Sequence, residues 1–130
     1  MPTRRVIIDH LKIGVSDLER SRRFYAQALE PLGYRDLERS SDEDPRREAS
    51  FGVEGVDDFA ISEKYEVGGQ VHIAFAADTK EQVDAFHAAA LAAGGKDNGL
   101  PGPRPKYSEG YYGAFVLDPD GHNVEAVFHG

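Results

Sequence analysis

Residues 110–128 read GYYGAFVLDPDGHNVEAVF and predict two strands joined by a tight turn. In the turn sequence DPDG, Pro119 restricts φ to about −65° and Gly121 permits a positive φ, and apolar runs flank the turn on both sides. The second run places Glu125 among apolar neighbours. Because a carboxylate is costly to bury unless it is paired or binds a cation, Glu125 indicates either an ion pair or a metal site.

The composition of the chain is typical of one globular domain of 130 residues, with 40% apolar and 29% charged residues. No apolar run has the length of a membrane span, and no signal peptide follows the basic N-terminus, so we expect a cytoplasmic protein that is not bound to a membrane. A net charge of −8 argues against nucleic acid as a partner. Because the chain has no cysteine, any metal must be bound by His, Asp or Glu.

The pattern of strand, helix and three strands occurs twice. The elements expected in the first unit are strands at 6–15, 34–39, 49–53 and 58–63, and a helix with the capping spacing of Ser16 and Glu19 that ends at Gly33. The charged segment 40–48 between them is predicted to be a solvated loop. In the second unit we expect a strand at 71–77, a helix with the capping spacing of Asp78 and Glu81, and the terminal hairpin. The Pro/Gly-rich segment 98–106 cannot be a central strand, so it is either a connection or a lid.

A shift of 62 residues superposes the two units, with His10 on His72, Phe24 on Phe86 and Gly33 on Gly95. We therefore predict an α+β fold in which two tandem βαβββ units, about 5–65 and about 70–130, form a concave mixed sheet within a single domain of residues 1–130.

A His-His-Glu set follows from this repeat. If the equivalent strands face one another, His10 and His72 lie opposite, and Glu125 on the last strand completes the set. Two imidazoles and one carboxylate suit Zn²⁺, Fe²⁺, Mn²⁺, Ni²⁺ or Co²⁺, and three protein ligands leave positions open for a substrate. The same pattern also fits a buried polar cluster in which Glu125 pairs with Lys12.

Three stretches resemble the vicinal oxygen chelate superfamily, which includes glyoxalase I, bleomycin-resistance proteins, fosfomycin-resistance transferases and extradiol dioxygenases. They are His10 with the following LKIGVSDLERSRRFYAQALEPLGY, His72 in VHIAFAAD, and FVLDPDGHNVEAV ending in Glu125. The resemblance implies one divalent metal ion on His10, His72 and Glu125, a small-molecule substrate and a homodimer. Two positions depart from particular members: Ala60 stands at the fourth ligand of glyoxalase I, and Phe115 at the tyrosine of the dioxygenases and fosfomycin transferases. The chain is most similar to the small glyoxalase-like proteins.

Further residues are expected to face the same cavity. Alternation along the strands points Lys12, Ser62 and Asn123 toward the ligands, and Tyr112 belongs to a tyrosine cluster that can form an aromatic wall. These four residues are the predicted substrate-binding residues. For Lys12, the alternative is a stem that packs on the sheet while its ammonium reaches water.

Two classes of function follow from the sequence. The first is a metal-dependent enzyme, of isomerase, lyase or dioxygenase type, in which the metal polarises a carbonyl or stabilises an enolate-like intermediate; no general base is assigned. The second is a metal-free protein that binds a small molecule or drug, as in the bleomycin-resistance branch. A third possibility is that the polar triad is only structural.

Overall fold

The computed structural model describes residues 8–39, 47–54, 56–69 and 71–130. The first unit consists of β1 (Leu11–Gly14), α1 (Leu18–Leu29), a 3₁₀ turn η1 (Glu30–Leu32), β2 (Arg35–Arg39), β3 (Glu48–Val53) and β4 (Val56–Ser62). The second consists of β5 (His72–Ala76), α2 (Lys80–Ala92), β6 (Lys96–Pro103), β7 (Tyr111–Leu117) and β8 (Asn123–His129). This confirms the predicted α+β class and the two tandem βαβββ units.

Each unit forms its own four-stranded mixed sheet, with strand orders β1-β4-β3-β2 and β5-β8-β7-β6. In each sheet the first strand of the unit pairs in parallel with the last strand, and the remaining pairs are antiparallel. The registers repeat as well, because Lys12 pairs with Ala60 and Ala74, 62 positions later, pairs with Glu125. The sequence alignment of Ala60 with Glu125 is therefore confirmed by the sheet geometry.

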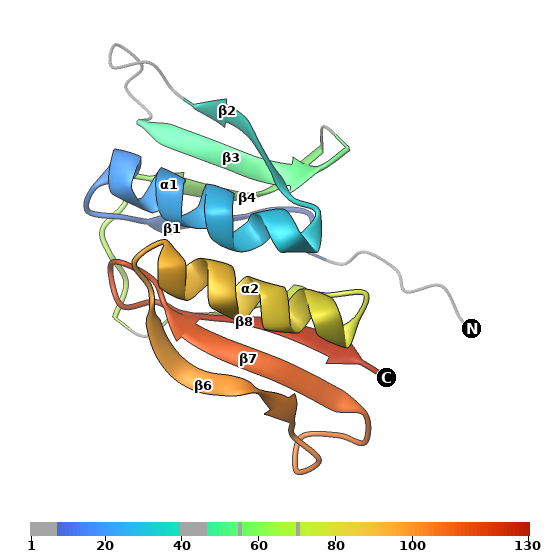
Figure 1. The fold of residues 1–130 in the computed structure, drawn as a ribbon. Coiled ribbons are helices and arrows are strands. Elements are labelled where there is room, and N and C mark those ends of the chain that lie inside the picture. The colour runs from blue at the N-terminus through green and yellow to red at the C-terminus, as the bar shows by residue number, and fades with distance from the viewer. Residues whose placement is uncertain (1–7, 40–46, 55, 70) are drawn as a thin grey trace.

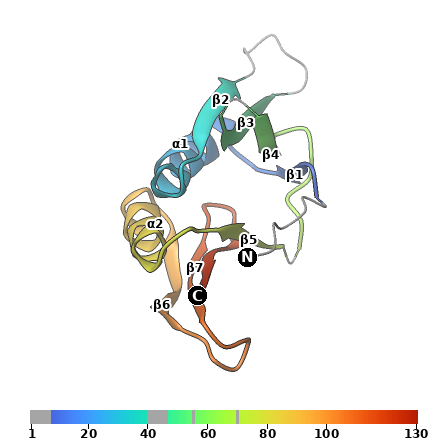
Figure 2. The ribbon, with the colours of Figure 1, turned by 90° about the vertical axis from the view of Figure 1, so that its right-hand side faces the viewer.

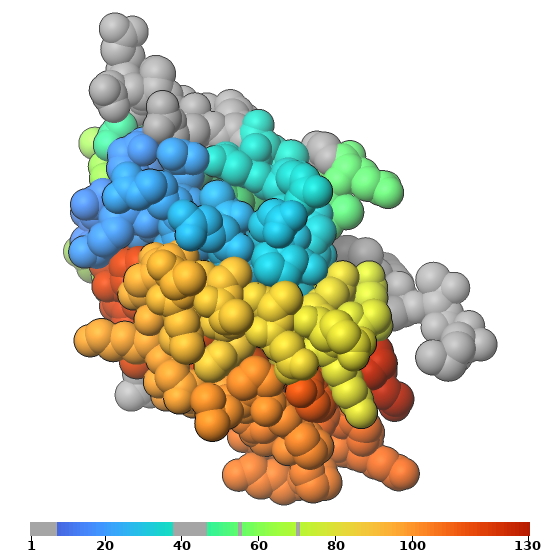
Figure 3. All heavy atoms as spheres, viewed as in Figure 1, coloured from blue at the N-terminus to red at the C-terminus, as the bar shows by residue number. Residues whose placement is uncertain are grey.

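The two helices lie side by side in front of the strands (Figure 1), and their side chains meet on the surface seen in Figure 3. Viewed from the side, both helices lie on one side and most of the strands on the other, with β6 below α2 (Figure 2). The core fills the space between these layers. It joins the two units, because the rings of Phe59 in β4 and Phe75 in β5 pack edge to face with centroids 5.2 Å apart. Within the described residues, no helix is long and apolar enough to cross a membrane.

Both helices begin one residue later than the capping pattern predicts. Asp17 caps α1 by accepting a hydrogen bond from the backbone N–H of Arg20 at 3.0 Å, and Thr79 caps α2 by accepting one from Gln82 at 3.1 Å. Both capping residues have the extended backbone that an N-cap requires. Ser16, the residue predicted to cap α1, bonds to the second unit instead.

The Pro/Gly-rich segment forms most of β6, which is the edge strand of the second sheet and, among the strands that the structure describes, pairs only with β7. Its register shifts twice along this pairing. Proline has no N–H to donate to a ladder, so it is tolerated at this edge but not between two strands. The expectation that the segment is not a central strand is confirmed. The expectation that it is either a connection or a lid is wrong for residues 98–103, which form an edge strand.

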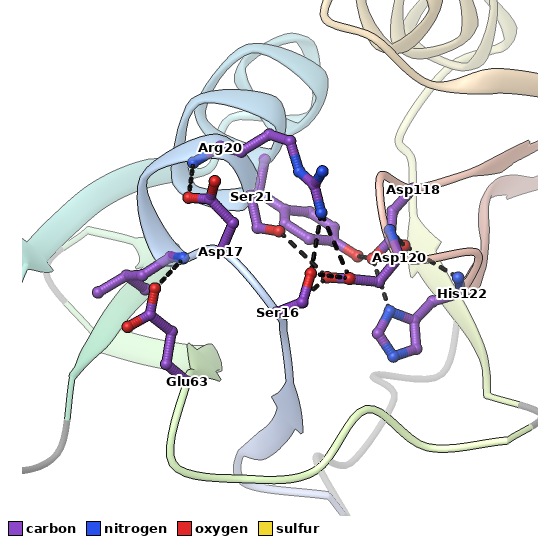
Figure 4. A network of polar contacts seen from close by, with 10 residues as sticks. Ser16, Asp17, Arg20, Ser21, Glu63, Asp118, Asp120 and His122 are labelled. Atoms are coloured by element: carbon purple, nitrogen blue, oxygen red, sulfur yellow. Dashed lines mark hydrogen bonds and ion pairs between the residues drawn. The ribbon is translucent and has the colours of Figure 1, made fainter.

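The turn at 118–121 also connects the two units (Figure 4). The hydroxyl of Tyr25 in α1 donates to Asp118 Oδ2 at 2.5 Å, and Asp120 accepts from the backbone N–H of Ser16 at 3.1 Å and from its hydroxyl. His122 Nδ1 lies 2.8 Å from Asp118 Oδ2, and the side chains of both residues are almost completely buried. The acidic residues of the turn thus hold the start of α1 against the second sheet.

The connection between the units crosses the face of β1 that is turned away from the helices. A Cβ atom added to Gly14 would lie 2.1 Å from the carbonyl oxygen of Glu66 and 2.5 Å from that of Tyr65. Only glycine permits so close an approach of two backbones. Position 14 therefore determines how closely the connection covers the first sheet.

Candidate functional site

Alternation along β8 separates an apolar face from a polar one. Val124 and Ala126 are fully buried in the core against α2, whereas Glu125 lies on the opposite, helix-free face of the second sheet. In the neighbouring strands, Ala74 of β5 and Phe115 of β7 are the partners of Glu125. The helix-free face around Glu125 is the candidate site.

Glu125 is buried but not isolated. Its side chain is 1% exposed, and His72 Nε2 lies 2.8 Å from Oε1. The hydroxyl of Tyr111 donates a hydrogen bond to the other oxygen, Oε2. The imidazole of His72 is 53% exposed, so it connects the buried carboxylate to the surface. Both carboxylate oxygens therefore have partners, as the burial of a carboxylate requires.

Tyr111 donates the hydrogen bond that orients the Glu125 carboxylate. Burial raises the pKa of the Tyr111 hydroxyl, and the hydrogen bond to the Glu125 carboxylate raises that pKa further. Tyr111 consequently stays protonated at neutral pH and holds Oε2, which leaves Oε1 oriented toward His72.

The donors at this face fit part of a metal site. An imidazole nitrogen and a carboxylate oxygen at this separation can bind the same divalent ion, and both suit the metals named above. His10, the third predicted ligand, immediately precedes β1; its ring Nδ1 lies 2.9 Å from Asp9 and its side chain is 71% exposed. Across the described ranges, no three His, Asp or Glu side chains are grouped closely enough for one ion. The structure thus brings together His72 and Glu125 but not His10.

The first sheet presents a different set of contacts at the equivalent position. Lys12 Nζ forms an ion pair with Glu48 Oε2 at 2.7 Å and lies 5.4 Å from the centroid of the Tyr65 ring. Its partner is therefore Glu48 rather than Glu125, and Glu48 begins β3 instead of ending a solvated loop. Ser62 is buried on the same sheet, where its hydroxyl accepts from the backbone N–H of Lys64 at 3.1 Å.

Glu63, the glutamate closest in sequence to Ala60 in the first unit, contacts α1 and Arg47. Its Oε2 accepts from the backbone N–H of Leu18 at 2.6 Å (Figure 4). Its Oε1 lies 3.0 Å from Arg47 Nε. Glu63 thus accepts one of the free N–H groups at the start of α1. This contact separates it from the Glu125 site.

Asn123 and His72 lie together at a cavity on the second sheet. The cavity measures about 410 Å³ and is lined by Gly69, Val71, His72, Gly121 and Asn123. Asn123 Oδ1 accepts from Asn98 Nδ2 of β6 at 3.2 Å. Of the predicted substrate-binding residues, Asn123 is the one that the structure places beside a predicted metal ligand.

Tyr112 lies on the opposite face from Glu125. Its hydroxyl donates to Asp84 Oδ1 of α2 at 2.7 Å, so the tyrosine at the site is Tyr111. The register of the terminal hairpin shows which of the two tyrosines shares a face with Glu125. Because the turn sets Phe115 opposite Glu125, the residues at even spacing from Phe115, including Tyr111, share the face of Glu125.

Comparisons with known proteins place this geometry in context. The model of the Glyoxalase/Bleomycin resistance protein/Dioxygenase superfamily matches residues 7–126. An uncharacterized protein of Bacillus subtilis, YqjT, is 33% identical over 124 residues, which cover 91% of this chain and 95% of that protein. A glyoxalase/bleomycin resistance protein of Albidiferax ferrireducens has a similar structure, with a TM-score of 0.75, 30% identity and coverage of 94% of this chain and 98% of that one.

The likeness to a more distant structure concerns the fold only. It is a mutant of the fosfomycin resistance protein FosX from Listeria monocytogenes, solved with Mn(II) and 1S,2S-dihydroxypropylphosphonic acid. The TM-score is 0.69 at 21% identity, with 93% of this chain and 90% of that chain covered.

Proposed function

The chain belongs to the Glyoxalase/Bleomycin resistance protein/Dioxygenase superfamily, and from this membership and the site we infer a divalent-metal-dependent enzyme that binds a small substrate through two adjacent oxygen atoms. The observation that carries this proposal is the contact of His72 Nε2 with Glu125 Oε1 at 2.8 Å, at the border of the cavity. An imidazole and a carboxylate are the donor types that these metals accept. The reaction is of the isomerase, lyase or dioxygenase type.

His72 and Glu125 would hold the metal, with His10 as the third ligand. When bound, the metal supplies a Lewis acid that polarises a substrate carbonyl. Tyr111 keeps the carboxylate of Glu125 oriented, and the buried position of that carboxylate excludes water from one side of the site. His10 has an exposed side chain at the start of β1, so rotation of its imidazole does not disturb the core.

One cavity residue and three residues outside it position the substrate in this proposal. The amide of Asn123 beside His72 offers a donor to a substrate oxygen. Phe115, whose ring centroid is 6.0 Å from that of His72, offers an apolar wall. Lys12 and Ser62 of the first sheet are the proposed contacts from the other unit.

The homodimer implied by the resemblance is part of the same proposal. Ile8 and Leu11, on either side of His10, have exposed side chains. The start of β1 therefore offers apolar surface to a second copy of the chain, next to the third proposed ligand. Sedimentation velocity of the wild type gives the oligomeric state directly.

Binding of acetohydroxamic acid, which chelates metals through two adjacent oxygens, tests the proposed function. We expect the Co²⁺-loaded wild type to change its visible spectrum when this probe is added. His72→Ala should show no such change, and His87→Gln, which removes a histidine of α2 that contacts Asp97, should behave as the wild type. Binding of the probe that is the same with and without metal would overturn the enzyme proposal and favour a metal-free binding protein of the bleomycin-resistance type.

A further inference from the structure

Arg104 directly follows β6 in the Pro/Gly-rich segment. Its Nη1 donates to the carbonyl oxygen of Gly102 at 2.9 Å, and its Nη2 donates to that of Leu100 at 2.8 Å. The guanidinium is thus fixed along the backbone of β6 instead of extending into solvent. This rigidity removes much of the entropy cost that an arginine otherwise incurs when it binds a ligand.

The glycines of β6 leave the space that this guanidinium occupies. A Cβ atom added to Gly99 would lie 3.3 Å from Arg104 Nη2 and 2.9 Å from Phe115 Cδ1. A Cβ atom at Gly102 would lie 3.4 Å from Nη1. The glycine at position 99 therefore allows Arg104 and Phe115 to lie against the strand, whereas the contact at Gly102 is an ordinary van der Waals distance.

Phe115 links this arginine to the candidate metal site. The Cζ atom of Arg104 is 5.5 Å from the centroid of the Phe115 ring, and the ring of His72 is 6.0 Å from the same ring. Phe115 also pairs with Glu125 across the strands. A positive charge is therefore held against the same aromatic ring that lies beside His72.

The charge of Arg104 has no acidic partner among the side chains that the structure describes. By contrast, Arg22 and Arg47 are paired with carboxylates in this chain of net charge −8. A guanidinium has five N–H donors, and the three carbonyl contacts, which include a longer one of 3.5 Å from Nη1 to Pro103, leave others for a ligand. The planar fork of these donors matches a carboxylate or a phosphonate.

We propose that Arg104 binds an acidic group on the substrate, so that the substrate class is a chelating compound with an anionic arm. Its two adjacent oxygens would bind at the metal site, the linking segment would pack on Phe115, and the anionic group would reach Arg104. The chelating end of this description rests on the proposed function, whereas the anionic end rests on Arg104 alone.

Two hydroxamates that differ only in their arm test the proposal on the Co²⁺-loaded protein. Acetohydroxamic acid has a neutral methyl group, and succinomonohydroxamic acid carries a carboxylate on a short chain. We expect the wild type to bind the acidic probe about ten-fold more tightly, as a charge-assisted pair implies. Equal binding of the two probes by the wild type would overturn the proposal.

Variants identify the residue responsible for the preference. Arg104→Gln should bind both probes equally, with unchanged affinity for acetohydroxamic acid. Lys106→Gln removes the same charge from an exposed side chain two residues away and should keep the preference. Gly99→Ala keeps the charge, but its Cβ would collide with Phe115 and crowd Arg104 Nη2, so it should displace both side chains and reduce the preference even if Arg104→Gln fails to fold. A preference that persists in Arg104→Gln would overturn the proposal.

A metal-free measurement separates this proposal from the proposed function. Titration of the metal-free wild type with succinate should shift the Nε–H resonance of Arg104 in ¹⁵N NMR with saturation, and the resonance is assigned by its loss in Arg104→Gln. If acetohydroxamic acid fails to bind but this shift occurs, the metal proposal fails and the anion site stands. If the resonance does not move, the anion site is refuted whatever the metal does.

Discussion

Tyr25→Phe tests whether the buried hydrogen bond to Asp118 holds the two units together. Tyr25 is fully buried, and its hydroxyl donates to Asp118 Oδ2 at 2.5 Å across the interface between α1 and the second sheet. The substitution removes this donor and leaves the ring in place. The edge-to-face contacts of the ring with Phe24 and Phe59, at 4.9 and 5.0 Å between centroids, should therefore remain.

The magnitude follows from burial and charge. A hydrogen bond to a charged group contributes about 1.5–3 kcal/mol, and the side chain of Asp118 is fully buried, so water cannot replace the lost donor. Asp118 keeps its contacts with His122, which moderates the loss. We expect the free energy of unfolding to fall by about 2 kcal/mol, equivalent to a decrease in Tm of roughly 8 °C for a domain of this size.

Urea denaturation followed by circular dichroism measures this change. Tyr34→Phe is the matched control, because its hydroxyl donates to Asp58 at 3.1 Å in a partly exposed position within the first unit. The control should lose less than about 1 kcal/mol. If Tyr25→Phe stays within about 0.5 kcal/mol of the wild type, the change expected of an unremarkable surface substitution, the reasoning about this interface is refuted.

Three further predictions follow. Gly14→Ala should displace the connection from β1, since its Cβ would collide with Glu66, and protease cleavage near that connection should become faster; unchanged cleavage contradicts this. Burial raises the pKa of Asp58, so ionised Asp58 costs stability at neutral pH, and Asp58→Asn should raise Tm there. The gain should shrink as the pH falls through this raised pKa and vanish below the ordinary pKa of an aspartate in the unfolded chain. A constant gain at all pH values would exclude this cause. Tyr111→Phe should weaken metal binding about ten-fold, measured by competition with a chelator, because Glu125 loses its orienting donor; equal affinity would remove Tyr111 from the site.

The repeat made most of the fold predictable from the sequence. The shift of 62 residues identified both units, and the alignment of Ala60 with Glu125 agrees with the strand registers of the structure. The pairing of His72 with Glu125 follows from neighbouring strands on one face. These features depend on local periodicity and on the order of strands, which a sequence records directly.

The remaining contacts depend on tertiary packing. Lys12 pairs with Glu48 because β3 extends further toward the charged segment than its composition suggests. Tyr111 and Tyr112 are adjacent and chemically identical, so only the register of the hairpin decides which one reaches Glu125. The residue that caps α1 is Asp17 and not the predicted Ser16, because Ser16 bonds to Asp120 of the second unit.

Metal content is the most direct test of the central claim, that His72 and Glu125, together with His10, hold one divalent ion. The wild type, His72→Ala and His10→Ala should each be incubated with Zn²⁺, Fe²⁺, Mn²⁺, Ni²⁺ or Co²⁺, dialysed and analysed for metal per chain. We predict about one ion per chain in the wild type with at least one of these metals, and loss of that ion in both variants. A wild type that stays empty with all five metals, or a His72→Ala variant that keeps its ion, would contradict the claim.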